Sequence, residues 1–531
     1  MQLLHLGHLV GVLLLILAGA MVPSWVIAAL DNGPDLAGLS SAVQWTTVVG
    51  LVLFLGTRRQ ARQRSLSHRA GFLIVGVAWL VAGLVGALPF FLYAHLSPEG
   101  ICEAAAQVAA LGEGRLPIGG EFCSFTDAAF ESISGFTTTG SSILTDGLWD
   151  GPGTMMAGDR PGLPRGVLLW RSMTHFLGGM GIVVLGVAIL PLLGVGGMEL
   201  FKAEVPGPTT DKLAPRVGET AKLLWKVYLL FSGIMFSLLM IGGIDAFSAV
   251  NHTMATMATG GFSLYSGSAA SFQSPYVEWV LILFMYMAGI NFNLHFVALR
   301  GRPLAPLKDP EWRVYTFICV AFTLIIALAL TSGADQAPEG HAHGFGTNVR
   351  IAAFQVLATI TTTGFASADF EAWTFAPAAL GFLMLLFFFG GMAGSTGGGV
   401  KVVRHILLVK QWVRELFLLI HPRGVRPVRL AGRPVPPAVM RGVFSFIGAY
   451  IALLAIGTLC FALDGQDMAT AFTASASALG NVGPGLGDIG PYDNWSVLGD
   501  AAKWIAGLLM LLGRLEIYTL LILLSPQFWR R

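Results

Sequence analysis

Residues 135–146 read GFTTTGSSILTD, and residues 359–370 read TITTTGFASADF. Each stretch places three threonines before a glycine, in a chain of 531 residues that is 54% hydrophobic and only 12% charged. Soluble domains carry roughly 25% charged residues, so about half that share indicates a lipid environment. A polar stretch that recurs in such a chain needs a structural reason.

Ten apolar runs are long enough to cross a bilayer core of roughly 30 Å. They lie near 5–30, 38–56, 70–95, 166–196, 221–243, 276–298, 313–331, 376–412, 438–462 and 500–525. A transmembrane β-barrel would show alternating segments of about ten residues instead. The sequence therefore predicts an all-α polytopic membrane protein with about ten transmembrane helices. No Lys or Arg precedes the first run, so we expect a retained span rather than a cleaved signal peptide.

Lys and Arg are concentrated in every second connection between these runs. The clusters at 58–69, 202–226, 300–313 and 401–441, with two arginines at the end of the chain, hold 25 of the 32 basic residues. The alternate connections carry acidic residues, including Asp31, Asp35, Asp488 and Asp493. By the positive-inside rule, both termini are expected in the cytoplasm.

Four of the non-cytoplasmic connections contain a short, half-apolar segment that breaks at a glycine. These segments are DAAFESISGFTTTGSS (127–142), VNHTMATMATGGFS (250–263), AAFQVLATITTTGFAS (352–367) and AFTASASALGNVGPGLG (471–487). Their alignment selects Gly140, Gly261, Gly364 and Gly483, which are 121, 103 and 119 residues apart. A repeated span–short helix–glycine loop–span unit follows. The predicted organisation is two N-terminal helices (1–69) and four pseudo-fourfold repeats (70–200, 201–312, 313–437 and 438–531).

The composition of the four glycine loops favours a cation site. Irregular backbone at membrane depth is tolerated only where it is buried in protein or lines a water-filled cavity. Around a common axis, Thr and Gly carbonyls can replace the hydration shell of a cation. The loops contain no Asp or Glu, which favours a weakly hydrated monovalent cation over Ca²⁺. Thr and Gly also allow close packing of transmembrane helices, but four equivalent occurrences favour an ion site.

The motifs resemble the TrkH/KtrB/HKT superfamily of potassium transporters, and within it the TrkH family. The resemblance covers nearly the whole chain. It rests on FTTTGSS (136–142), ATGGFS (258–263), TTTGFAS (361–367), NVGPGLG (481–487), WRSMTHFLGGMGIVVLGVAILP (170–191), FKAEVPGPTTDKLAPR (201–216), GGMAGSTGGGVKVVR (390–404) and LGRLEIYT (512–519).

This resemblance implies one potassium filter per subunit, which binds K⁺ through backbone carbonyls. The filter residues are expected to be Thr138, Thr139, Gly140, Thr259, Gly260, Gly261, Thr362, Thr363, Gly364, Asn481, Val482 and Gly483. Glycine at the first position is similar to the potassium-selective members. Gly480 departs from the family pattern, in which a bulkier residue is expected.

The stretch GGMAGSTGGG (390–399) interrupts the long run 376–412. A break is expected there because glycine destabilises a helix by roughly 1 kcal/mol per residue. The stretch lacks the GK[ST] and the preceding strand of a phosphate loop, whereas a GxxxG packing face stays open as an alternative. The resemblance implies an intramembrane gate below the filter. Its residues are expected to be Gly390, Gly391, Gly394, Ser395, Thr396, Gly397, Gly398, Gly399 and Arg514.

Arg514 lies inside the apolar run 500–525, where a charge is costly and usually faces a cavity or a partner. One interpretation is an ion pair with Glu516, although a two-residue spacing places the two on different helix faces. The resemblance instead places Arg514 on the permeation path beside the gate. Structural roles are expected for Arg171, Asn291, Asn293 and His295.

The basic, proline-rich stretch 413–441 is expected to contact anionic lipid headgroups or a soluble partner. The resemblance implies a homodimer on a cytoplasmic, nucleotide-binding regulatory subunit of the TrkA type. No Rossmann fingerprint occurs in this chain, so nucleotide is expected only on the partner. No covalent cofactor and no nucleic-acid partner are expected. Cys102 and Cys123 share one loop, and the sequence leaves open whether they form a disulfide.

Three functions are weighed. The first is gated potassium uptake across the bacterial cell membrane, driven by a membrane potential worth about 2.3 kcal/mol per charge per 100 mV. The second is a Na⁺-permeable or K⁺/Na⁺-coupled transporter of the same superfamily. The third is a membrane-embedded enzyme, for which the sequence shows no HExxH, no G-x-S-x-G and no intramembrane acid pair. We therefore do not expect an enzyme.

Overall fold

The structure is a computed structural model that describes residues 2–61, 68–111, 116–144, 162–188, 213–338 and 342–530. Several predictions lie outside these residues. They concern the basic residues Arg62, Arg64, Lys202 and Lys212, the end of the run 166–196, and most of the motif at 201–216.

Long apolar helices dominate the described residues. Six helical segments are long and apolar enough to cross a membrane, or up to eight if each of two bent helix pairs is one span. The six are α1 (Gln2–Asp31), α2 (Leu36–Ala61), α3 (His68–Gly86) with α4 (Leu88–Leu96), α10 (Leu213–Ile241), α15 (Pro310–Ser332) and α19 (Pro437–Leu463). Of the remaining four predicted runs, two form the bent helix pairs. The other two lie on α7 (Arg165–Ala188) and on α17 (Pro377–Leu386) with α18 (Val402–Ile420). The protein is an all-α polytopic membrane protein, as predicted.

Two predicted spans are sharply bent where the sequence pattern suggests continuous helices. α12 (Pro275–Ala288) and α13 (Phe292–Leu299) meet at 98°, and α21 (Asp500–Arg514) and α22 (Tyr518–Leu524) meet at 120°. Asn291 caps α13 by accepting a hydrogen bond from the N–H of Asn293 at 2.8 Å. At the second bend, Glu516 and Ile517 have φ of 57° and 60°, a region that β-branched residues rarely adopt. Arg514 is therefore the last residue of α21 and lies at the break between the two helices of the run 500–525.

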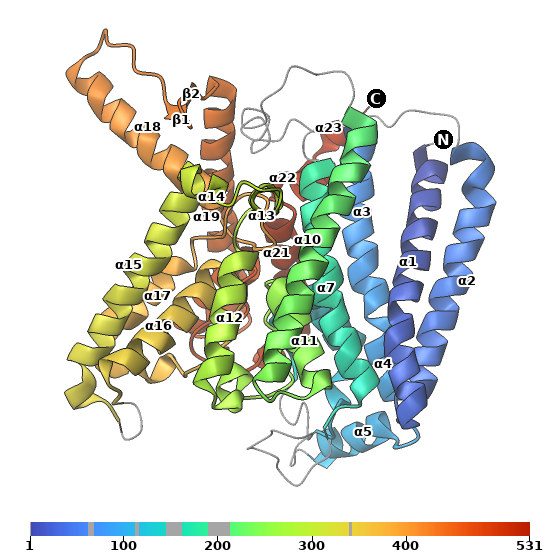
Figure 1. Cartoon of the computed structure of the whole chain (residues 1–531). Coiled ribbons are helices and arrows are strands. Elements are labelled where there is room, and N and C mark those ends of the chain that lie inside the picture. Colours follow the sequence, from blue (N-terminus) through green and yellow to red (C-terminus); the bar gives the residue numbers. More distant parts are fainter. Residues whose placement is uncertain are drawn as a thin grey trace.

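Four short helices stand between the spans: α6 (Phe125–Phe136), α11 (Ala246–Met257), α16 (Phe345–Ile360) and α20 (Met468–Gly480). They begin beside polar residues; the side chains of Asp245 and Asp467 accept hydrogen bonds from the first N–H groups of α11 and α20. α6 packs on α3, α7 and α21, and α11 packs on α7, α10 and α12. α16 packs on α12, α15 and α17, and α20 packs on α19 and α21. The short helices are thereby surrounded by spans (Figure 1).

The core consists of two large clusters of buried apolar side chains. One involves α1, α3, α4, α6, α7 and α19 to α22, and the other α7, α10 to α12 and α15 to α17. The glycine loops contribute to both, with Val482 in the first cluster and Phe365 in the second. The loops therefore lie where the two clusters meet.

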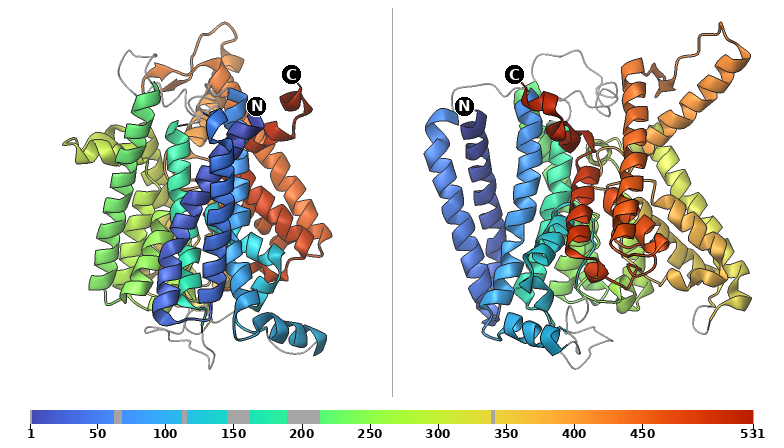
Figure 2. Two further views of the ribbon diagram at one scale, coloured as in Figure 1. Left: turned by 90° about the vertical axis from the view of Figure 1, so that its right-hand side faces the viewer. Right: turned by 180° about the vertical axis from the view of Figure 1, so that it is seen from behind.

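Both chain ends lie at the same end of the bundle (Figure 2). α18 projects from that end with a two-stranded hairpin, β1 (Arg429–Leu430) and β2 (Arg433–Pro434). The hairpin turn is Ala431–Gly432, both at positive φ, as a two-residue hairpin turn requires. This hairpin is a small departure from the all-helical prediction. The remaining helices are α14 (Ala305–Lys308), α23 (Pro526–Trp529) and, at the opposite end of the bundle, α5 (Ile101–Leu111).

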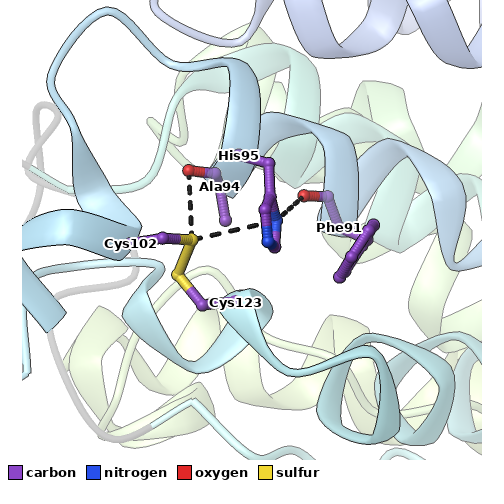
Figure 3. Close-up of a disulfide and its surroundings, with 5 residues drawn as sticks. All are labelled: Phe91, Ala94, His95, Cys102 and Cys123. Carbon is purple, nitrogen blue, oxygen red and sulfur yellow. Dashed lines mark hydrogen bonds between the residues drawn. A yellow bond between two sulfur atoms is a disulfide. The ribbon is translucent and has the colours of Figure 1, made fainter. Parts of the chain in front are cut away.

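Cys102 and Cys123 form a disulfide beside α4 (Figure 3). The bridge joins the start of α5 to the short turn Gly120–Cys123 that precedes α6. The sulfur of Cys102 lies 3.4 Å from the carbonyl oxygen of Ala94. The remaining cysteines, Cys319 and Cys460, are free. The disulfide settles the pairing that the sequence leaves open.

Asp35 joins the connection between α1 and α2 to the start of α7. Its Oδ2 accepts a hydrogen bond from the N–H of Val167 at 3.1 Å, while its Oδ1 is buried without a partner in the structure. Burial is the largest cause that raises the pKa of Asp35, from 3.8 to about 6. The folded protein therefore holds this proton to a higher pH than the unfolded chain does.

We predict that Asp35 destabilises the fold as pH rises through about 6, because stability falls wherever the folded state binds more protons than the unfolded state. Asp35→Asn keeps an acceptor oxygen for Val167 and removes the titration. Thermal unfolding in detergent is measured at about pH 4.5 and about pH 7.5, below and above the pKa of Asp35 in the folded protein. The parent is expected to lose stability between the two pH values, and Asp35→Asn is expected to lose less. An equal loss in both proteins would contradict the assignment.

Candidate functional site

The four short helices end in the same way. The residues Thr138, Thr259, Thr362 and Asn481 have φ of 52°, 55°, 57° and 56°. After each of them, the next N–H bonds to the carbonyl five residues back: Thr139 to Ser134, Gly260 to Ala255, Thr363 to Ala358 and Val482 to Ser477, at 2.8–3.0 Å. This is the Schellman termination, in which the left-handed residue is usually Gly or Asn. Gly480, the departure from the family pattern, leaves this geometry intact.

A glycine follows two residues later in every loop, again at positive φ. The values are 83° at Gly140, 82° at Gly261, 77° at Gly364 and 109° at Gly483. A Cβ on Gly140 would collide with the carbonyl oxygen of Gly260, on Gly261 with that of Thr363, and on Gly364 with that of Val482. A Cβ on Gly483 would lie 2.8 Å from the carbonyl oxygen of Thr139. The contacts pass from loop to loop and return to the first, so the four loops form a closed ring.

A cavity of about 90 Å³ opens onto this ring. All four glycines line it, together with Ser141 and Asp493. A water molecule needs only about 10–15 Å³ of such space, so the cavity has room for a hydrated cation. Partial burial and the nearby carboxylates of Asp369 and Asp488 raise the pKa of Asp493. Carboxylates at the mouth of a cleft raise the local cation concentration.

Side chains outside the ring fix the loops from behind. Arg171 on α7 donates from Nε to Glu131 of α6 at 2.6 Å and from Nη1 to the carbonyl of Ser263 at 2.8 Å. His175 bonds the carbonyl of Gly135 at 2.9 Å and accepts the N–H of Phe262 at 3.2 Å. Both α7 side chains therefore join the first loop unit to the second. Arg171 has the structural role expected of it.

The other side of the ring is covered by residues 390–399, hereafter the glycine loop. It separates α17 from α18, so the predicted helix break is confirmed. Gly398 donates its N–H to Thr362 Oγ1 at 2.6 Å, and Thr396 Oγ1 bonds the carbonyl of Met257 at 3.2 Å. A Cβ on Gly397 would lie 2.9 Å from the carbonyl of Thr361. The glycine loop thus packs against the C-terminal ends of the short helices.

The glycine loop also occupies the bend between α12 and α13. Met392 donates its N–H to the carbonyl of Gly289 at 2.9 Å, and Phe292 donates to the carbonyl of Gly394 at 3.1 Å. Asn291 lies beside Gly394, where an added Cβ would be 3.1 Å from its side chain. His295 lies one turn further on and bonds the carbonyl of Met287 at 2.9 Å. The bend supplies the polar backbone groups that the loop pairs with.

Arg514 is buried directly beside the glycine loop. Its Nη1 donates to the carbonyl of Thr396 at 2.7 Å and its Nη2 to that of Gly178 at 3.4 Å. The expected alternative, an ion pair with Glu516, is wrong because Glu516 pairs with Arg404 of α18. The positive charge of Arg514 thus lies near the partially negative C-terminal ends of the short helices.

The structure brings the four loops that hold the twelve predicted filter residues together in one ring. Of the predicted gate residues, Thr396, Gly397 and Gly398 contact the ends of the short helices, whereas Gly391 and Gly394 lie against the α12–α13 bend. Sequence reasoning missed the supporting roles of Glu131, His175 and Asp493. Glu131 is an acidic residue within the half-apolar segment 127–142. An ionisable residue in such a segment indicates a buried partner of opposite charge, so its role could have been predicted. His175 and Asp493 carry no comparable pattern.

These features define a polytopic helical protein with a four-loop site between its helices. Residues 112–531 match the TrkH family, described as cation transport proteins. The chain is 38% identical over 526 residues to the Trk system potassium uptake protein TrkH of Escherichia coli (strain K12), covering 98% of both chains. The identity to TrkH of Halomonas elongata is 37% over 537 residues, covering 100% of both.

The fold is also similar to that in the crystal structure of the potassium transporter TrkH from Vibrio parahaemolyticus. The TM-score is 0.83 at 34% sequence identity, covering 100% of both chains. The chain belongs to the TrkH family. The resemblance drawn from the motifs is confirmed.

We predict that Glu131→Ala destabilises the protein by about 3–5 kcal/mol, because it leaves the buried charge of Arg171 unpaired. Asp31→Asn is the matched control, since it removes an exposed ion pair with Arg165 that is worth roughly 0–1 kcal/mol. Thermal unfolding in detergent compares the two. A similar small effect of both changes would rule out the supporting role of the Arg171–Glu131 pair.

Proposed function

We propose that the protein takes up K⁺ across the bacterial inner membrane through the ring formed by the four loops that follow the short helices. The ion would be held by backbone carbonyls of residues 138–140, 259–261, 362–364 and 481–483. The chain would comprise two N-terminal helices and four repeats at 70–200, 201–312, 313–437 and 438–531. No reaction is catalysed in this proposal, and no covalent cofactor is involved.

The observation that carries the proposal is the closed ring of glycine–carbonyl contacts through Gly140, Gly261, Gly364 and Gly483. Each of the four loops follows the C-terminal end of a short helix, which bears partial negative charge. The ring contains no carboxylate, in keeping with a weakly hydrated monovalent cation. The names of the Escherichia coli and Halomonas elongata relatives as potassium uptake proteins support K⁺ as that cation.

Both termini would lie in the cytoplasm. The Lys and Arg clusters support this orientation. The Cys102–Cys123 disulfide supports it as well, because disulfides persist in oxidising compartments. The cavity at the ring, and Asp493 at its mouth, would then face the outside, where K⁺ enters.

The glycine loop and Arg514 would form the gate on the cytoplasmic side of the ring. In the position described, the guanidinium of Arg514 adds a positive charge that raises the barrier to a cation. Movement of the glycine loop would remove the carbonyl of Thr396 from Arg514 and so change that barrier.

The relatives are named as members of a Trk system, which supports regulation by a further subunit. We assign to this chain a homodimeric assembly on a cytoplasmic, nucleotide-binding subunit of the TrkA type. Arg423, Arg426, Arg429 and Arg433, which are exposed between the end of α18 and the end of the hairpin, support contact with that subunit or with anionic lipid headgroups.

Gly364→Ser is expected to lower the preference for K⁺ over Na⁺ by about tenfold or more, since a change of about 1.4 kcal/mol is sufficient. The added side chain would meet the carbonyl oxygen of Val482 at a positive φ. Rb⁺ uptake into proteoliposomes, with Na⁺ as competitor, measures the preference. Gly381→Ser is the matched control, because nothing lies within 4 Å of its added Cβ. Unchanged selectivity in Gly364→Ser would refute the filter, and Na⁺ uptake equal to K⁺ uptake in the parent would favour the Na⁺-permeable alternative.

Deleting residues 392–397 is expected to raise Rb⁺ flux, because it removes the backbone contacts that hold the loop in the α12–α13 bend. The K⁺/Na⁺ preference should be preserved, since the deletion leaves the ring residues in place. Flux and preference are measured in the same proteoliposomes. Equal or lower flux at normal expression would exclude the gate.

A further inference from the structure

The carboxylate of Glu311 joins the glycine loop to the start of α18. Its Oε1 accepts the N–H of Ala393 at 2.9 Å and the N–H of Val403 at 3.0 Å. Ala393 lies within the loop, and Val403 is in the first turn of α18. Glu311 itself is buried on the first turn of α15. One side chain from a different helix thus links the loop to the helix that follows it.

The first turn of α18 has no side-chain cap from its own N-cap residue. Its N-cap residue is Lys401, whose side chain makes no cap hydrogen bond. The first N–H groups of a helix have no intrahelical partners, and a carboxylate near them is favoured by the helix dipole. Glu311 supplies that carboxylate from outside the helix. Hydrogen bonds to an ionised acceptor are roughly twice as strong as those between neutral groups.

The same turn of α18 is held from a second direction. Arg404, the residue after Val403, pairs with Glu516 in the α21–α22 bend. The start of α18 is therefore tied to α15 through Glu311 and to α21 and α22 through Arg404. Of these two side chains, Glu311 also binds the glycine loop, through the N–H of Ala393.

Glu311 lies next to an exposed connection between two helices. It follows the connection between α13 and α15, where the side chains of Leu304 and Leu307 are 63% and 46% exposed. Arg313 donates from Nε to the carbonyl of Leu307 at 2.7 Å and so fixes this connection to the first turns of α15. The start of α15 and the start of α18 pack together at the end of the bundle that holds the chain termini (Figure 1).

We propose that Glu311 is the positioning residue that holds the glycine loop in its blocking position, and that displacement of the α13–α15 connection releases it. The inference rests on the gate proposed above. A cytoplasmic partner that moves this connection moves Glu311 with it, and the N–H groups of Ala393 and Val403 then lose their acceptor. The blocking position of the loop is then less stable relative to other positions, although its contacts with the α12–α13 bend and with Thr362 remain, and the filter is unchanged.

The test is Rb⁺ flux into proteoliposomes that contain the full chain without a partner protein. Glu311→Ala is expected to raise the flux about tenfold, the shift in the opening equilibrium when one charge-assisted hydrogen bond is lost from the blocked state. Glu311→Gln retains an acceptor oxygen and should give a smaller increase. Glu415→Ala is the matched control, because it removes an exposed carboxylate from α18 far from the loop.

A second measurement separates a positioning role from general damage. Ser395 is buried in the glycine loop, so Ser395→Cys reports loop movement through its reaction with a water-soluble thiol reagent. Labelling should be faster when Glu311→Ala is combined with Ser395→Cys, while the K⁺/Na⁺ preference stays unchanged. The parent, with its free cysteines Cys319 and Cys460, gives the background.

The gate and the positioning role fail in different ways. If deletion of 392–397 raises flux but Glu311→Ala changes neither flux nor labelling, Glu311 does not position the loop. If the deletion leaves flux unchanged, the gate is refuted and the role of Glu311 with it. In the deletion background, Glu311→Ala should add no further flux, and a further increase would overturn the proposal. If Glu311→Ala does not fold, Glu311→Gln decides by the same criteria.

Discussion

The close approach of four backbone segments is the constraint on which the rest of the structure depends. At Gly140, Gly261 and Gly364, a single added carbon would collide with the carbonyl oxygen of the next loop. Each loop can therefore come this near only where a residue has no Cβ and accepts positive φ. The short helices are placed by this requirement, because each must end where its loop enters the ring. The spans are in turn arranged around the short helices.

The ring has two unlike sides, and the difference is electrostatic as well as steric. One side opens to a cavity with Asp493 at its mouth. The other side is covered by the glycine loop and by the charge of Arg514. The acidic side chain of Asp493 and the buried guanidinium of Arg514 thus lie on opposite sides of the ring. The side that holds Arg514 is built from backbone hydrogen bonds between irregular segments, including those of Met392 with Gly289 and of Phe292 with Gly394.

Much of the architecture follows from local properties of the sequence. Apolar runs predict the spans, and the recurring glycines predict the loops, because both depend on residue type and spacing alone. The glycine-rich stretch at 390–399 predicts its own helix break for the same reason. The bends at Gly289–Asn291 and at Glu516–Ile517 were not predictable in this way. The first bend is stabilised by two backbone hydrogen bonds, from the N–H of Met392 to Gly289 and from the N–H of Phe292 to Gly394. The paired residues lie about a hundred residues apart in sequence, so local sequence patterns do not reveal the pairing.

The sequence by itself determined that this is a membrane protein with four short helices that each end in a glycine-containing loop, and which residues those loops contain. Only the tertiary structure decided how the buried charges are paired. Glu516 lies two residues from Arg514 but binds Arg404, and Glu311 caps a helix that begins far beyond its own. The reason is physical: a buried charge must find a partner among whatever groups the fold brings within hydrogen-bonding distance. Nearness in sequence does not determine that distance.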